Sequence, residues 1–265
     1  MPATVTFLSD YGQDDEFVGV CHAVIARIAA DARVIDLTHG IARHDVRTGA
    51  IVLRRALPYC APGVHLAVVD PEVGGERRAI ALRTAEEERL LVGPDNGLLS
   101  LAAQRFGGAV EAIDIARSPH RLEPVSATFH GRDLFAPVAA HLAAGGSLAE
   151  AGEPLDPDEL VQLHMPMARL EDGELHAHAI AIDGFGNVTL DVEHPEIAGF
   201  GLRLGRPVLV NGHEAHYTTT FADVPPGALL IYEDAYRALA LAVNRGSAAE
   251  LLGIGRDDEL RIAPR

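Results

Sequence analysis

The sequence has few cysteines and lacks any long apolar run. Its 265 residues include two cysteines, Cys21 and Cys60, which lie far apart and fit no metal-binding spacing. Cys21 falls within an apolar helical pattern, where a buried thiol is expected. No apolar run reaches the ~18 residues of a membrane span, and the N-terminus shows no charged-then-apolar leader. We therefore expect a soluble, cytoplasmic protein with no membrane partner.

Basic residues are also scarce. The chain has 22 Lys and Arg against 38 Asp and Glu, a formal net charge of −16. Such a charge repels phosphate backbones, so nucleic acid is not an expected partner. A solvated acidic surface explains the charge, and so would an acidic site for a cationic substrate.

Several common site motifs are missing too. The sequence has no P-loop, no glycine fingerprint of a dinucleotide-binding fold and no strong metal motif. Histidines cluster loosely at His176, His178, His213 and His216. Residues two apart on a strand share a face, so His176 and His178 could bind a metal ion together. A metal-dependent hydrolase that uses these histidines is therefore an alternative.

What the sequence does contain is an alternation of predicted strands and helices in its first half. Apolar residues make up 48% of the chain, enough for a sizeable core in one large domain or two smaller ones. Strand, helix, strand, helix, strand favours a mostly parallel sheet covered on both faces. The strands are predicted at 5–8, 34–37, 64–69, 80–83, 90–92 and 109–115, and the helices at 16–28, 46–57, 96–106 and 133–144.

The pattern changes after residue 150. A proline-containing acidic segment predicts a linker over 151–170, between an α/β domain at 1–150 and a second domain at 171–265. Short strands between turn signals indicate that the second domain is small and mostly β. They are predicted at 175–182, 188–192, 207–210 and 228–232, followed by one helix at 236–243.

Carboxylates fall at the ends of three predicted strands. Asp10, Asp36 and Asp70 each lie at or near such an end. Ligands bind at the carboxyl ends of the strands in open α/β sheets, so these residues are candidates for a site. The alternative is turn chemistry, for which aspartate is equally common.

Two segments could carry chemistry in the first domain. Asp70 is followed by a glycine-containing loop and by Arg77 and Arg78, which could form a functional pair with it or an ion pair that holds the loop. His130 and Gly131 precede Asp133 at a predicted helix start, where backbone amides could cradle an anion or a water molecule. In the alternative, Asp133 only caps the helix.

Two further motifs read most simply as turns. Residues 183–187, Asp-Gly-Phe-Gly-Asn, fit a glycine-rich hairpin turn between two strands. Residues 93–97, Gly-Pro-Asp-Asn-Gly, fit a turn followed by a helix cap.

Together and in order, these motifs resemble the S-adenosylmethionine hydroxide adenosyltransferase family, the SAM hydrolases, whose relatives are the bacterial fluorinase and chlorinase. The resemblance runs over nearly the whole chain, and its most specific part is the run 128–133, Thr-Phe-His-Gly-Arg-Asp, together with Asp70-Pro71. It implies an N-terminal α/β domain, a C-terminal β-barrel-like domain, and a homotrimer with sites between subunits. The other matching stretches are residues 8–12, 35–39, 68–71, 93–97, 185–187 and 244–249.

The resemblance also implies a catalytic triad. An Asp-Arg-His triad of the hydrolase branch falls on Asp70, Arg77 and His130, with Arg78 as the adjacent alternative to Arg77. In the halogenase branch a tyrosine replaces the aspartate, and the fluorinase has Tyr-Ser where this chain has His130-Gly131. These residues favour water over halide as the nucleophile.

The implied reaction is hydrolysis of S-adenosylmethionine to adenosine and methionine, by attack of water on the ribose 5′ carbon, with no cofactor and no metal. By resemblance, Asp10 would bind the ribose hydroxyls, Asp183 the methionine ammonium and Asn187 the adenine edge, and Gly131 would also lie in the substrate site. Ala235 departs from the family, which often has a serine there to hold the methionine carboxylate. The alternatives are a halide-using enzyme and a non-catalytic protein that binds adenosine or S-adenosylmethionine.

Overall fold

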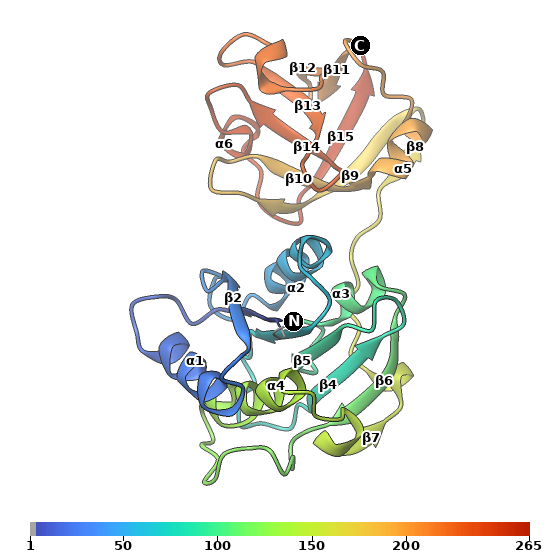
Figure 1. Ribbon diagram of the computed structural model, residues 1–265. Coiled ribbons are helices and arrows are strands. Elements are labelled where there is room, and N and C mark those ends of the chain that lie inside the picture. The colour runs from blue at the N-terminus through green and yellow to red at the C-terminus, as the bar shows by residue number, and fades with distance from the viewer. Residues whose placement is uncertain (1–3) are drawn as a thin grey trace. The chain divides into compact units, whose positions relative to one another are not determined.

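The computed structural model describes residues 4–265, which divide into two compact units between Leu163 and His164 (Figure 1). The fold class predicted from the sequence is confirmed: an α/β unit is followed by a β-barrel unit. The division between the two units falls within the predicted linker over 151–170. Residues Glu153–Leu155 form strand β7, which pairs with β6, so the first unit continues to Leu163.

The first unit is built on a seven-stranded sheet in the order β2-β1-β3-β5-β4-β6-β7. The pairs β1–β2, β1–β3 and β3–β5 are parallel, whereas β4, β6 and β7 join antiparallel. The carboxyl ends of β1, β2 and β3 therefore meet at one edge. The strands before β7 are β1 (Thr4–Ser9), β2 (Arg33–Thr38), β3 (Val64–Val68), β4 (Ala79–Thr84), β5 (Leu90–Pro94) and β6 (Ala109–Asp114).

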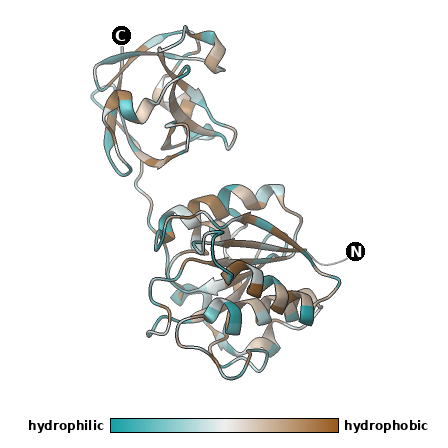
Figure 2. Ribbon diagram, turned by 90° about the vertical axis from the view of Figure 1, so that its left-hand side faces the viewer, coloured by the Kyte–Doolittle hydropathy of each residue, from teal (hydrophilic) through white to brown (hydrophobic). Residues whose placement is uncertain are grey.

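Helices cover both faces of this sheet, as Figure 1 shows. Helices α1 (Phe17–Ile28) and α4 (Ala136–Ala143) pack on the face that carries Phe7, and α2 (Val46–Ala56) and α3 (Ser100–Arg105) on the face that carries Leu8. Successive strand residues point to opposite faces, so nearly continuous apolar strands supply two cores. Brown segments in Figure 2 mark these strands.

The second unit is a closed barrel of seven strands in the order β10-β14-β13-β12-β11-β15-β9, with β9 pairing back to β10. Strand β8 (Arg169–Glu171) is an appendage on β9. The barrel strands are β9 (Glu174–Ile182), β10 (Val188–Glu193), β11 (Pro207–Val210), β12 (His213–Tyr217), β13 (Leu229–Glu233), β14 (Ala238–Val243) and β15 (Glu259–Pro264). Two short helices accompany them, α5 (His194–Ile197) and α6 (Ala248–Leu252).

The helix predicted at 236–243 is wrong, because these residues form strand β14. All six residues Ala238–Val243 are buried, and a short apolar run of this kind does not distinguish helix from strand by periodicity. Asp234 favours a turn here. Its carboxylate accepts hydrogen bonds from the backbone N–H groups of Tyr236 (2.8 Å) and Ala238 (3.0 Å) and closes the turn between β13 and β14. Arg237 takes a positive φ of 67° in that turn.

The helix predicted at 133–144 begins differently in the structure. Gly131–Phe135 forms one π-helical turn, and α4 follows directly. Such turns are rare and occur frequently at functional sites. Between residues 4 and 265, no helix combines the length and apolar character needed to cross a membrane.

Candidate active site

Asp70 and Arg77 form a buried ion pair within one loop. Asp70 lies two residues beyond the end of β3, and Arg77 lies two residues before the start of β4. The Arg77 Nε donates to both carboxylate oxygens of Asp70 at 3.0 Å, and its Nη2 donates to Asp70 Oδ2. Each side chain is only 5% exposed. Such a two-pronged contact fixes the orientation of the carboxylate.

His130 joins this pair from a distant part of the chain. It immediately precedes the π-helical turn, and its Nδ1 lies 2.8 Å from Arg77 Nη2. The ring of Phe135 packs near both side chains, 5.3 Å from the Arg77 guanidinium carbon and 6.5 Å from the His130 ring. The structure therefore brings the three predicted triad residues together, with Arg77 between Asp70 and His130.

Arg78, the alternative to Arg77, points elsewhere. Its guanidinium pairs with Asp95 (2.8 Å) and reaches the backbone oxygen of Glu159. Asp95 in turn accepts from the backbone N–H of Val161 at 2.9 Å. Asp95 thus anchors the segment that leads to the second unit. The predicted helix cap differs from the structure, because α3 begins at Ser100 and its N-cap residue, Leu99, makes no side-chain cap bond.

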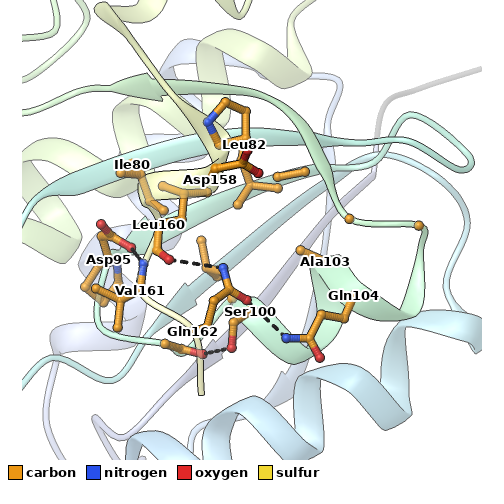
Figure 3. A pocket seen from close by; sticks show the side chains of 17 residues that line it. Ile80, Leu82, Asp95, Ser100, Ala103, Gln104, Asp158, Leu160, Val161 and Gln162 are labelled. Atoms are coloured by element: carbon orange, nitrogen blue, oxygen red, sulfur yellow. Dashed lines mark hydrogen bonds between the residues drawn. The ribbon is translucent and has the colours of Figure 1, made fainter. Parts of the chain in front are cut away.

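A separate cavity of about 390 Å³ lies beside this anchor (Figure 3). Its polar groups bond to one another: Ser100 Oγ accepts from the backbone N–H of Leu163 (3.1 Å), and Gln104 donates to Gln162 (3.0 Å). None of the predicted site residues lines it. The polar contacts in Figure 3 join the 157–163 segment to α3 and to the loop after β5.

Gly131 is required by the close approach of Tyr11. A Cβ added at Gly131 would lie 2.0 Å from the Tyr11 hydroxyl oxygen. The Tyr11 ring is itself held by edge-on contacts with Phe7 and Phe129, at centroid distances of 6.3 and 5.7 Å. Tyr11 was not a predicted site residue, since nothing in local sequence spacing shows that residues 11 and 131 meet.

Asp10 and Asp36 occupy the carboxyl ends of β1 and β2, as predicted. Asp10 Oδ2 accepts from the backbone N–H of His44 at 2.9 Å, in the loop before α2. Asp36 instead contacts two histidines, His22 (2.8 Å) and His39 (3.1 Å). Asp10 therefore shares its loop with Tyr11, whereas Asp36 belongs to a different cluster.

Asp183 and Asn187 form the turn between β9 and β10. Asp183 Oδ1 accepts from the backbone N–H of Phe185 (2.9 Å) and Asn187 (3.0 Å), and the Asn187 amide donates to Asp183 Oδ2 (2.8 Å). The hairpin interpretation accounts for these bonds. Phe185 at the tip of the turn is 81% exposed.

The segment around Ala235 is the other turn of interest in the barrel. Glu233 pairs with His194 (2.5 Å) and Arg237 (3.0 Å), so its negative charge has two basic partners. Asp234 is used to close the turn. The acids beside Ala235 therefore have structural partners.

Burial sets the protonation state of the triad histidine. Burial, and then the Arg77 guanidinium, lower the pKa of His130, and Asp70 and Asp133 oppose that shift only in part. His130 is therefore neutral near pH 7. Burial also raises the pKa of Tyr11 well above its usual value, so its hydroxyl stays protonated.

Comparisons with known proteins identify the family of this chain. Residues 5–152 match the model of the SAM hydroxide adenosyltransferase N-terminal domain, and residues 177–261 match that of the C-terminal domain. The chain is 47% identical over 260 residues to the (R)-S-adenosyl-L-methionine hydrolase of Salinispora tropica, covering 97% of each chain. It is 30% identical to a fluorinase of Actinopolyspora mzabensis, covering 92% of each.

A solved structure has the same fold. The crystal structure of an uncharacterized conserved protein from Thermotoga maritima matches with a TM-score of 0.91 and 35% identity, over 98% of this chain and 99% of that one. Both halves of the sequence match one family. The chain belongs to the SAM hydroxide adenosyltransferase family.

Proposed function

We propose that this protein hydrolyses S-adenosylmethionine to adenosine and methionine. The observation that carries the proposal is the contact of Asp70, Arg77 and His130 beside a π-helical turn. The sulfonium of the substrate leaves as a neutral thioether, so no general acid and no cofactor are needed. The reaction needs a nucleophile, because neutral water is poor at in-line displacement on the ribose 5′ carbon.

The tautomer of His130 determines which residue of the proposed triad can act as the base. A guanidinium can only donate, so His130 Nδ1 accepts from Arg77 Nη2, and the neutral ring carries its proton on Nε2. That Nε2–H is a donor that can hold the oxygen of a water molecule. It is not a base, so the proton of the water has to go elsewhere.

Asp70 is the base in this proposal. Its carboxylate accepts a proton from the attacking water, and Arg77 holds the carboxylate in place through both Nε and Nη2. General base catalysis contributes roughly 10²–10⁴-fold. Placing the water in line with the departing sulfur adds to this by orientation.

Binding roles follow from the same family membership. Asp10 accepts the ribose hydroxyls, which a carboxylate can do with both oxygens. Gly131 belongs to the substrate site through its place beside His130, where it lets Tyr11 approach the π-helical turn. In the barrel, Asp183 pairs with the methionine ammonium, and Asn187 offers its amide to the adenine edge.

We further propose a homotrimer with sites between subunits. Membership of the family supports this proposal. The cytoplasmic location stays a prediction from the sequence.

The adjacent arginines allow a matched test. Asp70→Asn should lower kcat for adenosine release at least about tenfold while KM stays close to wild type, because the base is lost and the substrate contacts remain. Arg77→Lys should lower kcat as well, since lysine cannot make the two-pronged contact. Arg78→Lys is the control and should keep kcat near wild type. An Asp70→Asn enzyme with full turnover would overturn the proposed mechanism.

A further inference from the structure

A second cluster of reactive side chains lies in the first unit, outside the proposed catalytic residues. It consists of His22 on α1, Asp36 on β2 and His39 just after β2, and we call it the His22–Asp36–His39 cluster. Asp36 Oδ1 lies 2.8 Å from His22 Nε2 and 3.1 Å from His39 Nε2. The ligand atoms of the three residues all lie within 4.8 Å of one another. We propose that this cluster binds a divalent transition-metal ion, with Zn²⁺ as the best fit.

The spacing suits a metal ion. Zinc binds imidazole nitrogen at about 2.0–2.1 Å in a tetrahedral arrangement, so its ligand atoms lie about 3.4 Å apart. The two histidine–carboxylate separations, 2.8 and 3.1 Å, lie slightly below this value, and the two histidine nitrogens lie within 4.8 Å of each other, so small side-chain shifts would meet it. Two imidazoles and one carboxylate form a ligand set that zinc and other first-row metals use.

The buried nitrogen of His39 is the independent observation. The His39 side chain is 3% exposed, and its Nε2 is buried without a well-formed hydrogen bond, although it points toward Asp36. Buried polar atoms normally have a partner. A cation between the three side chains would give the Nε2 lone pair that partner.

The surroundings of His39 match those of a metal ligand. Ser9 Oγ lies 2.8 Å from His39 Nδ1, and it can accept Nδ1–H and so leave Nε2 free to bind metal. The Phe7 ring packs edge-on against the His39 ring at 4.7 Å and restricts its rotation. Ligating histidines typically have such support on their second nitrogen.

The site is open to solvent on one side. His22 is 35% and Asp36 41% exposed, so an ion can enter without unfolding. Three protein ligands leave one tetrahedral position for water or another ligand. Sequence spacing alone does not predict this site, because its ligands come from separate elements and fit no linear motif; only Asp36 was a candidate, as a strand-end carboxylate.

The test measures binding without reference to hydrolysis. The full-length protein is stripped with a chelator and dialysed, then titrated with Zn²⁺ in equilibrium dialysis and with Co²⁺ by visible absorption. We expect one Zn²⁺ to bind per chain, at the cluster. We expect bound Co²⁺ to show the visible absorption bands of an ion with a low coordination number. His22→Ala and Asp36→Asn should each weaken Zn²⁺ binding at least about tenfold, and Ser9→Ala should weaken it about 10–100-fold through the loss of support for His39.

A matched control separates this cluster from an ordinary histidine–carboxylate pair. His194 lies 2.5 Å from Glu233 and is 50% exposed, with no second histidine in the contact. His194→Ala should bind Zn²⁺ as the wild type does, and circular dichroism confirms that each variant is folded. Absence of Zn²⁺ binding by the wild type, or equal affinity in Asp36→Asn, would overturn the proposal.

Discussion

Gly131→Ala tests whether the contact between Tyr11 and the π-helical turn holds the site in shape. An added Cβ would meet the Tyr11 hydroxyl oxygen at 2.0 Å and two ring carbons at 3.0 and 3.2 Å, where ordinary contact begins at 3.4 Å. The hydroxyl would have to retreat by more than 1 Å, against a ring packed on Phe7 and Phe129. Overpacking of this kind costs about 1–3 kcal/mol of the free energy of unfolding.

Tyr11→Phe supplies the rescue. It removes the oxygen at 2.0 Å, so the closest atom to the new Cβ becomes a ring carbon at 3.0 Å. Urea denaturation of the wild type, both single variants and the double variant measures the coupling, which we expect to be favourable by about 1–2 kcal/mol. Because His130 adjoins residue 131, kcat should also fall in Gly131→Ala and recover in part in the double variant. Additive free energies would refute the steric argument.

Three further outcomes are expected. Because the pKa of His130 is lowered, kcat should stay constant from pH 8 to below 6.5 and fall at more acid pH. The fall is expected where the imidazolium forms, since its Nδ1 can no longer accept a hydrogen bond from Arg77. A pH–rate profile that already falls above pH 7 would contradict this. Burial, and then Arg89, lower the pKa of His65 to about 3. As pH falls from 6.5 towards 3, the unfolded chain therefore takes up a proton that the folded chain does not. The free energy of unfolding should drop by up to about 1.4 kcal/mol per pH unit over this range. His65→Gln should show a shallower slope in denaturant titrations, and an unchanged slope would count against the buried neutral imidazole. Asp95→Ala removes the buried carboxylate that pairs with Arg78 and the acceptor for the Val161 N–H. It should lower the free energy of unfolding by about 1–3 kcal/mol and speed amide exchange at Val161, and unchanged exchange would contradict the anchoring role.

Apolar periodicity predicted most of the first unit. The strands at 5–8 and 64–69 were found because a sheet covered on both faces needs nearly continuous apolar runs. The same reasoning failed at 236–243, where the turn made by Asp234 outweighs a pattern that suits helix or strand. Strand β12 was missed because His213–Tyr217 holds few apolar residues.

The candidate site was predicted in part. The resemblance indicated Asp70, Arg77 and His130, but the contact between Arg77 and His130 spans 53 residues and follows only from the fold. The choice between Arg77 and Arg78 also needed the structure, since consecutive residues entering β4 turn to different partners.

Hydrolysis in heavy-oxygen water tests the central claim most directly. In the proposed mechanism, a water molecule held beside Asp70 attacks the ribose 5′ carbon. The label should therefore appear in the 5′ hydroxyl of adenosine and not in methionine. Chloride or fluoride added to the same reaction should yield no halogenated adenosine. Unlabelled adenosine, or binding of S-adenosylmethionine without release of methionine, would contradict the account.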